Sequence, residues 1–150
     1  MTGVLDEFKT PLHRDTFDIL AGRHIGQGCY RDVWTLRSDD SRVVKFETTA
    51  GSFCNVYEHE VWNEVKDDKE LRKWFAPVLD ISANGIVLVQ MRTEPVRKRE
   101  LPKMVPAFFS DLKTENWGWL DGRYVCHDYG NNAVMRTGLT RRMKAAKWWR

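Results

Sequence analysis

Asp111-Leu112-Lys113-Thr114-Glu115-Asn116, followed by Asp128-Tyr129-Gly130, is the most informative stretch of this 150-residue chain. It supplies a carboxylate, an amide five residues later, and a second carboxylate twelve residues after that amide. Mg²⁺ prefers oxygen ligands, and one or two protein ligands suffice where phosphate and water oxygens complete the octahedron. Asn116 and Asp128 are therefore the predicted magnesium ligands, and Asp111 remains to orient an attacking hydroxyl.

The order Asp-x-x-x-x-Asn followed by Asp-aromatic-Gly resembles the catalytic loop and metal-binding turn of the protein kinases. Residues 111–116 read almost letter for letter as the family's Asp-Leu-Lys-Pro-Glu-Asn. The resemblance implies that ATP and Mg²⁺ are the cofactors and that Asn116 and Asp128 hold the metal. It also implies that Asp111 acts as the base and that Lys113 neutralises charge on the transferred phosphoryl group.

An upstream segment, residues 25–33, resembles the glycine-rich loop of the same family. Gly26 and Gly28 stand at the first two glycine positions, and Val33 stands at the valine position. Glycine matters there because a backbone without a side chain can approach phosphates closely. Arg31 replaces the third glycine, and this departure either stiffens the loop or adds a charge over the phosphates.

Val43-Val44-Lys45 resembles the family's Val-Ala-Ile-Lys strand, whose lysine holds the α- and β-phosphates. The resemblance implies a partner glutamate on the next helix. We select Glu58, because apolar residues follow it at the third and fourth positions and place it beside an apolar stripe. Two other glutamates compete for this role, Glu60 and Glu64.

Each of these features has an ordinary explanation when it is considered separately. Gly26 and Gly28 suit a hairpin turn, Lys45 suits a strand edge, Glu58 suits a solvated helix position, and residues 128–130 suit a turn. Their order and separation favour one shared explanation, the resemblance to the protein kinases, which extends over about residues 23–130.

The pattern predicts an α+β fold in a single kinase-like domain. Its amino-terminal lobe, an antiparallel sheet plus one long helix, is expected over about residues 20–91, and a truncated carboxy-terminal lobe over 92–150. A lead-in precedes the sheet, either irregular or helical. Strands are expected on both sides of the glycine loop within 22–37, at 42–46, and at 78–82 and 86–91 around the hairpin turn Asn84-Gly85.

The helix is expected from about Phe53 to Trp74, with Ser52 as its cap and a brief break at Asp67-Asp68. The segment 92–99 corresponds to the hinge of the family, and adenine is expected to bond to backbone groups of Gln90–Arg92. A short helix is expected over 101–110. A second hairpin, 117–120 with 123–127, should bring Asn116 and Asp128 together through its Asp121-Gly122 turn.

The chain also departs from the kinase pattern. Phe109-Ser110 stands where the family has His-Arg, and the stretch between the hinge and Asp111 is short. Only twenty residues follow Gly130, and they contain no Ala-Pro-Glu motif. We therefore expect no phosphorylation-controlled activation segment and no large helical lobe that would hold a peptide substrate.

Two hypotheses of different classes follow. In the first, the protein binds Mg-ATP and transfers the γ-phosphate to a hydroxyl acceptor on a protein. In the second, it is a catalytically inactive kinase-like binding module, a pseudokinase, that inhibits or regulates a partner protein. Reduced chains of this kind resemble proteins found in bacteriophage genomes, and this implies a host protein as the target or partner, in the host cytoplasm.

Charge is distributed unevenly. Residues 1–90 carry 11 basic and 15 acidic side chains, whereas residues 91–150 carry 13 and 6. The basic tail, residues 141–150, ends in two tryptophans and an arginine. It is either a final helix whose tryptophans pack on the protein body, which we favour, or a nucleic-acid contact. Exposed aromatic surface near the tail also makes a homodimer conceivable.

The three cysteines, Cys29, Cys54 and Cys126, lack the spacing of a zinc site with the four histidines. An odd number of cysteines fits a reducing compartment. The sequence shows neither a signal peptide nor an apolar run long enough to span a bilayer. We therefore expect a cytoplasmic location and no membrane contact.

Overall fold

The structure, a computed structural model, describes residues 11–49, 51–96, 101–130 and 138–150. It has an α+β fold with an antiparallel sheet. The chain divides into two units, which we call unit 1 (Met1–Val56 and Val78–Arg92) and unit 2 (Tyr57–Pro77 and Thr93–Arg150). The division after Arg92 falls where the hinge was expected, whereas Tyr57–Pro77 groups with unit 2.

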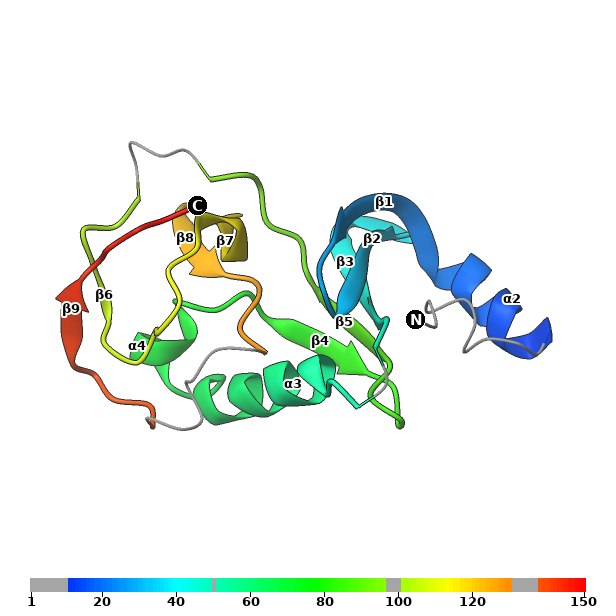
Figure 1. Cartoon of the computed structure of the whole chain (residues 1–150), viewed down its shortest axis with the longest axis horizontal. Coiled ribbons are helices and arrows are strands. Elements are labelled where there is room, and N and C mark those ends of the chain that lie inside the picture. Colours follow the sequence, from blue (N-terminus) through cyan, green and yellow to red (C-terminus); the bar gives the residue numbers. More distant parts are fainter. Residues whose placement is uncertain (1–10, 50, 97–100, 131–137) are drawn as a thin grey trace. The chain divides into compact units, whose positions relative to one another are not determined.

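A five-stranded antiparallel sheet forms unit 1 (Figure 1). Its spatial order is β1-β2-β3-β5-β4, so β5, the last strand of this sheet along the chain, lies between β3 and β4. The hairpin expected around Asn84-Gly85 is present, and Gly85 has the positive φ (76°) that a turn after Asn84 requires. The strands are β1 (Ala21–Gln27), β2 (Arg31–Leu36), β3 (Asp39–Glu47), β4 (Val78–Ile81) and β5 (Val87–Met91).

The lead-in to this sheet is helical. Helix α2 (Pro11–Leu20) places Phe17 against Trp34 and Phe46, with ring centroids 5.4 and 5.0 Å away. Phe17, Ala21, Val44 and Phe46 form the buried cluster that holds the helix to the sheet.

The expected helix over residues 53–74 is divided into α3 (Cys54–Val65) and α4 (Lys69–Arg72). The predicted break is confirmed, because the Asp68 carboxylate accepts from the backbone N–H groups of Glu70 and Leu71 and caps α4.

The Ser52 cap of the first helix is a wrong prediction. The Ser52 hydroxyl instead donates to the Glu47 carboxylate. That carboxylate accepts from the Asn55 N–H in the first turn of α3, at 2.6 Å. An ionised carboxylate satisfies a helix N-terminus more strongly than a hydroxyl.

Unit 2 contains two small antiparallel ladders. β7 (Trp117–Leu120) and β8 (Arg123–Cys126) form the predicted hairpin, and both turn residues, Asp121 and Gly122, have positive φ. A short 3₁₀ turn, η2 (Thr114–Asn116), leads into β7. β6 (Met104–Pro106) pairs with β9 (Met143–Ala145), and these strands lie side by side in Figure 1.

The β6–β9 ladder corrects two predictions, the helix over 101–110 and the helical tail. Pro102 and Pro106 have no backbone N–H and oppose a helix, whereas an extended segment can pair with another strand. The tail supplies that strand: Ala107 N–H donates to the Arg142 carbonyl, and Ala146 N–H donates to the Lys103 carbonyl.

Aromatic side chains supply the core of unit 2. Phe109 packs on Phe75 and on Trp117, with ring centroids 5.2 and 4.8 Å away. Trp148 of the tail contacts Trp117 at 5.1 Å, and Tyr129 contacts Phe75 at 4.9 Å. The expected packing of a tail tryptophan on the body is therefore confirmed, although the tail is not helical.

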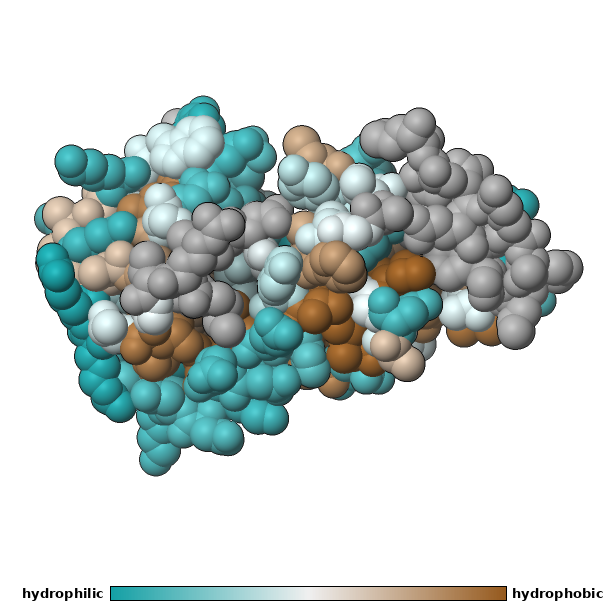
Figure 2. All heavy atoms as spheres, turned by 60° about the horizontal axis from the view of Figure 1, so that its bottom comes forward, coloured by the Kyte–Doolittle hydropathy of each residue, from teal (hydrophilic) through white to brown (hydrophobic). Residues whose placement is uncertain are grey.

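The exposed face of α3 is hydrophilic (Figure 2), and it includes Glu60, Asn63 and Glu64. Among the described residues, the helices are too short and too polar for any of them to cross a membrane.

Candidate nucleotide and magnesium site

Three of the predicted nucleotide-binding residues form one row across unit 1. Gly26 on β1 lies opposite Val33 on β2, and Val33 lies opposite Lys45 on β3. Directly opposed residues of antiparallel strands project from the same face of a sheet. The register therefore brings the Val33 and Lys45 side chains together, and Lys45 is almost fully buried at 3% exposure.

The two loop glycines are not required by the fold itself. Neither Gly26 nor Gly28 has a positive φ. A Cβ added at Gly26 would lie 3.8 Å from Val33, and one added at Gly28 would lie 3.8 Å from the Arg31 carbonyl, both ordinary contacts. Gly118 differs, because a Cβ there would come within 2.5 Å of the Thr93 Cβ and 2.8 Å of the Glu94 carbonyl.

Arg31, which replaces the third loop glycine, belongs to a buried network. Arg31 is 6% exposed, and its guanidinium donates to the Asn55 Oδ1 at 3.2 Å. The Asn55 amide donates in turn to the carbonyls of Lys45 and Ile86. These contacts tie the start of β2 to β3 and to the first turn of α3, and they accord with the stiffening role.

The tip of the β1–β2 loop is also fastened. Gly28 N–H donates to the Arg31 carbonyl at 2.8 Å, which closes the turn. Thr48 N–H donates to the Tyr30 carbonyl at 2.8 Å, and the Thr49 hydroxyl donates to the Cys29 carbonyl at 3.3 Å. The segment after β3 thus holds the loop at two points.

At the predicted hinge, Gln90 is fully buried on β5. The Arg92 N–H donates to the Ser41 carbonyl, and the Arg92 guanidinium binds Asp40 at 2.8 Å. Adenine recognition by this backbone stays a prediction, and the Arg92 amide is already used by the sheet.

Glu58 differs from the two competing glutamates by its burial: it is fully buried, whereas Glu60 and Glu64 are exposed. Within unit 2, its Oε1 accepts from the N–H groups of Tyr129 (2.8 Å) and Gly130 (3.2 Å). This contact fastens the Asp128-Tyr129-Gly130 turn to α3, and sequence reasoning did not identify it. The pairing of Glu58 with Lys45 stays a prediction.

Three predicted residues of unit 2 meet at one end of the β7–β8 hairpin. The Asn116 carbonyl accepts from the His127 N–H at 2.8 Å and from the Asp128 N–H at 3.3 Å. The Asn116 side-chain amide donates to the Asp111 Oδ2 at 3.4 Å, and the Asp111 Oδ1 accepts from the Lys113 N–H at 3.1 Å. The hairpin therefore brings Asn116 and Asp128 together, as its sequence predicted, and a side-chain hydrogen bond adds Asp111 to them.

The Lys113 side chain has contacts of its own. Its ammonium lies 3.2 Å from the Glu115 carboxylate and 5.5 Å from the centre of the Trp149 ring. Both contacts attract a cation. A role in neutralising a transferred phosphoryl group stays a prediction, and it requires Lys113 to exchange these contacts for that group.

His127 was not selected from the sequence as a site residue. One ring nitrogen (Nδ1) lies 2.8 Å from the Thr93 hydroxyl, and the other (Nε2) lies 2.7 Å from the Glu115 carbonyl. The carbonyl can only accept, so Nε2 carries a proton. His127 thereby connects residues 111–116, which we call the Asp111 loop, to Thr93. Its position immediately before Asp128 was the available signal.

The tail also contacts the Asp111 loop. Thr114 N–H donates to the Trp149 carbonyl at 2.8 Å, and Trp149 N–H donates to the Leu112 carbonyl at 3.2 Å. The Trp148 indole N–H donates to the Pro102 carbonyl, and Lys144 donates to the Phe109 carbonyl. The tail is thus a structural part of unit 2, held by backbone pairing and by side-chain contacts.

The chemistry of the donors fits magnesium. The Asn116 amide oxygen and the Asp128 carboxylate are hard ligands, and two such ligands suffice where phosphates supply the others. In the described part of the chain, no group of three or more His, Cys, Asp or Glu side chains has the arrangement of a metal site.

Two comparisons with known proteins accompany this geometry. The chain matches no protein-family model and no curated protein sequence.

Proposed function

We propose that the protein is a reduced kinase-like protein that binds Mg-ATP and transfers the γ-phosphate to a hydroxyl acceptor on a protein. The supporting observation is the joining of Asp111, Asn116 and Asp128 at one end of the β7–β8 hairpin. These three residues match the catalytic and metal-binding positions of the kinase pattern.

Each residue has a defined role in this proposal. Asn116 and Asp128 would hold Mg²⁺, which neutralises charge on the phosphates when it is bound. Lys45 binds phosphate oxygens, and Asp111 orients the acceptor hydroxyl and takes its proton. Because phosphoryl transfer depends mainly on positioning and electrostatics, a small scaffold is sufficient.

Unit 1 supports the nucleotide part of the proposal. Lys45 lies on the third strand of the sheet, in one row with Gly26 and Val33, and this position supports its assignment to the phosphate-binding lysine of the kinase pattern. Within the described part of the chain, a Cβ at Gly26 or Gly28 would make only ordinary contacts, and neither residue has a positive φ. The close approach of a ligand to the backbone would explain glycine at these two positions.

Thermal unfolding tests the binding step. At 100 times its dissociation constant, Mg-ATP should stabilise the protein by about 2.7 kcal/mol. That corresponds to a rise of roughly 5–11 °C in the melting temperature. EDTA or the Asp128→Ala substitution should reduce the rise, and Lys45→Ala should reduce it as well. No rise with millimolar Mg-ATP would reject nucleotide binding.

Incorporation of labelled phosphate tests the transfer step. Asp111→Asn should abolish incorporation while the affinity for ATP stays within about threefold, because Asp111 does not hold the nucleotide. Equal incorporation by the wild type and Asp111→Asn would disprove the assigned base.

A second candidate function is a kinase-like module that binds nucleotide without transferring phosphate and regulates a partner protein. The observation that favours it is the engagement of Lys113 by Glu115 and Trp149. A melting shift with Mg-ATP but no incorporation into any protein or into the chain itself would support this candidate over the first.

A further inference from the structure

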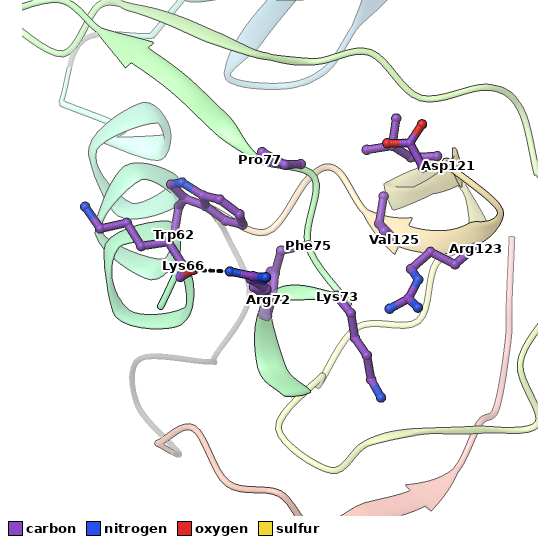
Figure 3. Close-up of a pocket in the computed structure, with 10 residues that line it drawn as sticks. Trp62, Lys66, Arg72, Lys73, Phe75, Pro77, Asp121, Arg123 and Val125 are labelled. Atoms are coloured by element: carbon purple, nitrogen blue, oxygen red, sulfur yellow. Dashed lines mark hydrogen bonds between the residues drawn. The ribbon is translucent and has the colours of Figure 1, made fainter. Parts of the chain in front are cut away.

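Unit 2 contains a hollow that lies apart from the residues assigned above. It has a volume of about 380 Å³. Figure 3 shows side chains of the α3–α4 segment on one side of it and of the β7–β8 hairpin on the other. None of its lining residues belongs to the predicted nucleotide, metal or catalytic set.

Positive charge dominates the lining. Four basic side chains reach it from different parts of unit 2, whereas Asp121 is the single acidic residue among the lining residues. The cations are Lys66 after α3, Arg72 in α4, Lys73 at the end of α4, and Arg123 on β8.

One of these charges is already compensated. Lys73 donates to the Glu70 carboxylate at 3.0 Å. This hydrogen bond lowers the pKa of Glu70, so the carboxylate is ionised at neutral pH. Among the residues that the structure describes, the Arg72 guanidinium donates to one group, the backbone oxygen of Lys66, at 3.4 Å. Lys66, Arg72 and Arg123 therefore provide the net positive field of the hollow.

The hollow also has an apolar part. Phe75 and Val125 are buried beneath it, at 1% and 2% exposure. Trp62, Pro77 and Leu120 are partly exposed along its walls. A cavity of this volume accommodates one or two apolar side chains, while the surrounding cations attract negative groups.

We propose that this hollow binds an acidic segment of a partner protein, with an apolar side chain in the hollow and Asp or Glu side chains at Lys66, Arg72 and Arg123. The proposal does not depend on nucleotide binding. It names the chemistry of the partner: an aliphatic or aromatic residue flanked by carboxylates.

Two observations favour a peptide over other anions. A small phosphate is best held by converging backbone N–H groups, as at a helix N-terminus, and the N-terminus of α4 is already capped by Asp68. A nucleic acid presents a phosphate at every step and would meet the carboxylates of Asp121 and Glu70. An acidic peptide can place its carboxylates only where cations lie.

Fluorescence anisotropy provides the test. The probe is a fluorescein-labelled peptide, Glu-Glu-Leu-Phe-Glu-Glu, at neutral pH and about 0.1 M salt, where exposed charges still interact over roughly 10 Å. The comparison probes carry Ala-Ala in place of Leu-Phe, Lys in place of Glu, or are a twelve-nucleotide single-stranded DNA. The test variant is the double substitution Arg72→Glu and Arg123→Glu, and the matched control is Lys147→Glu with Arg150→Glu.

The control pair makes the same change in net charge at two exposed residues outside the hollow. The wild type should bind the acidic apolar peptide more tightly than the other probes. The hollow variant should lose about tenfold or more in affinity, and the control should lose less than about threefold. The milder pair Arg72→Gln and Arg123→Gln provides the same comparison should the charge reversal unfold the protein.

Several results would overturn the proposal. Equal losses in the hollow variant and in the control would show that the peptide senses only the overall charge. Tighter binding of DNA, with loss in the hollow variant, would assign the surface to nucleic acid. Absence of peptide binding at millimolar concentration would reject the site.

Discussion

At the scale of single residues, substitution of Gly28 and of Gly118 distinguishes a glycine that a ligand would require from a glycine that the packing requires. Gly28→Ala meets no close contact, so we expect the free energy of unfolding to change by less than about 0.5 kcal/mol. The affinity for Mg-ATP should nevertheless fall, because in the proposed nucleotide site the new methyl group would obstruct the approach of the phosphates. Urea unfolding and the melting shift with Mg-ATP provide the two measurements.

Gly118→Ala is the matched comparison. Its new Cβ would meet Thr93 and the Glu94 backbone, so we expect a loss of about 1–3 kcal/mol in stability. If Gly118→Ala were as stable as the wild type, the close approach of these segments would be wrong. If Gly28→Ala bound Mg-ATP normally, the phosphate-loop assignment would be wrong.

Glu58 carries the second prediction at this scale. Glu58→Ala removes an acceptor from two buried N–H groups, at Tyr129 and Gly130, and we expect a loss of about 3 kcal/mol. Glu58→Gln keeps an oxygen acceptor and should lose less. Glu60→Ala and Glu64→Ala alter exposed positions on the same helix and should stay within about 0.5 kcal/mol of the wild type. Chemical denaturation of the four variants distinguishes these outcomes.

The choice of Glu58 shows which properties of a residue the local sequence can predict and which it cannot. An apolar stripe beside a glutamate predicts that this position faces inward, and the burial of Glu58 agrees. The same pattern does not reveal which groups occupy the interior next to it. Tyr129, more than seventy residues away, is found only through the fold.

At the scale of elements, the tail is the part with the clearest test. Trp148→Ala removes a ring contact with Trp117 and a hydrogen bond to Pro102, and should cost about 2–3 kcal/mol of stability. Trp149→Ala should cost less than about 1 kcal/mol, because this side chain is half exposed and its backbone makes the pairing. Hydrogen exchange at the Thr114 amide should accelerate in Trp148→Ala, since its acceptor is the Trp149 carbonyl.

The tail hypothesis of nucleic-acid binding is tested by removing residues 139–150 and measuring the salt dependence of DNA affinity. Arg141 pairs with Asp68, and Lys144 donates to the Phe109 carbonyl, so these cations are engaged within unit 2. We expect little DNA affinity in the full chain and no loss on truncation. A large, salt-sensitive loss would revive the hypothesis.

Hairpins and helix breaks were predictable from sequence because their causes are local. Asn84-Gly85 and Asp121-Gly122 adopt the turns that their backbone preferences require, and Asp68 caps the helix it precedes. The ladder between β6 and β9 joins segments about forty residues apart, and the local sequence of either segment does not identify its pairing partner. The two wrong helix predictions both fall in this ladder, where pairing outweighs local propensity.

At the scale of the whole molecule, neither unit is a continuous piece of chain. Residues 57–77 belong to unit 2 although the sequence of unit 1 continues after them. A fragment of residues 93–150 would lack Phe75, the acceptor at Ala76 and the Glu58 carboxylate, which hold Phe109 and Tyr129.

We therefore expect this fragment to be unfolded in isolation. Far-ultraviolet circular dichroism and the dispersion of its amide resonances would show this. Addition of a synthetic peptide of residues 54–77 should restore part of the structure. A fragment that folds without the peptide would contradict the division into these two units.

The strand order β1-β2-β3-β5-β4 has a consequence for synthesis on the ribosome. β3 and β4 both emerge before β5, and each leaves a pairing edge open until Val87–Met91 follows and inserts between them. Open edges of nascent chains invite pairing with other chains. Slow translation just before Val87 should thus favour aggregates, and rare codons placed there would expose this vulnerable interval.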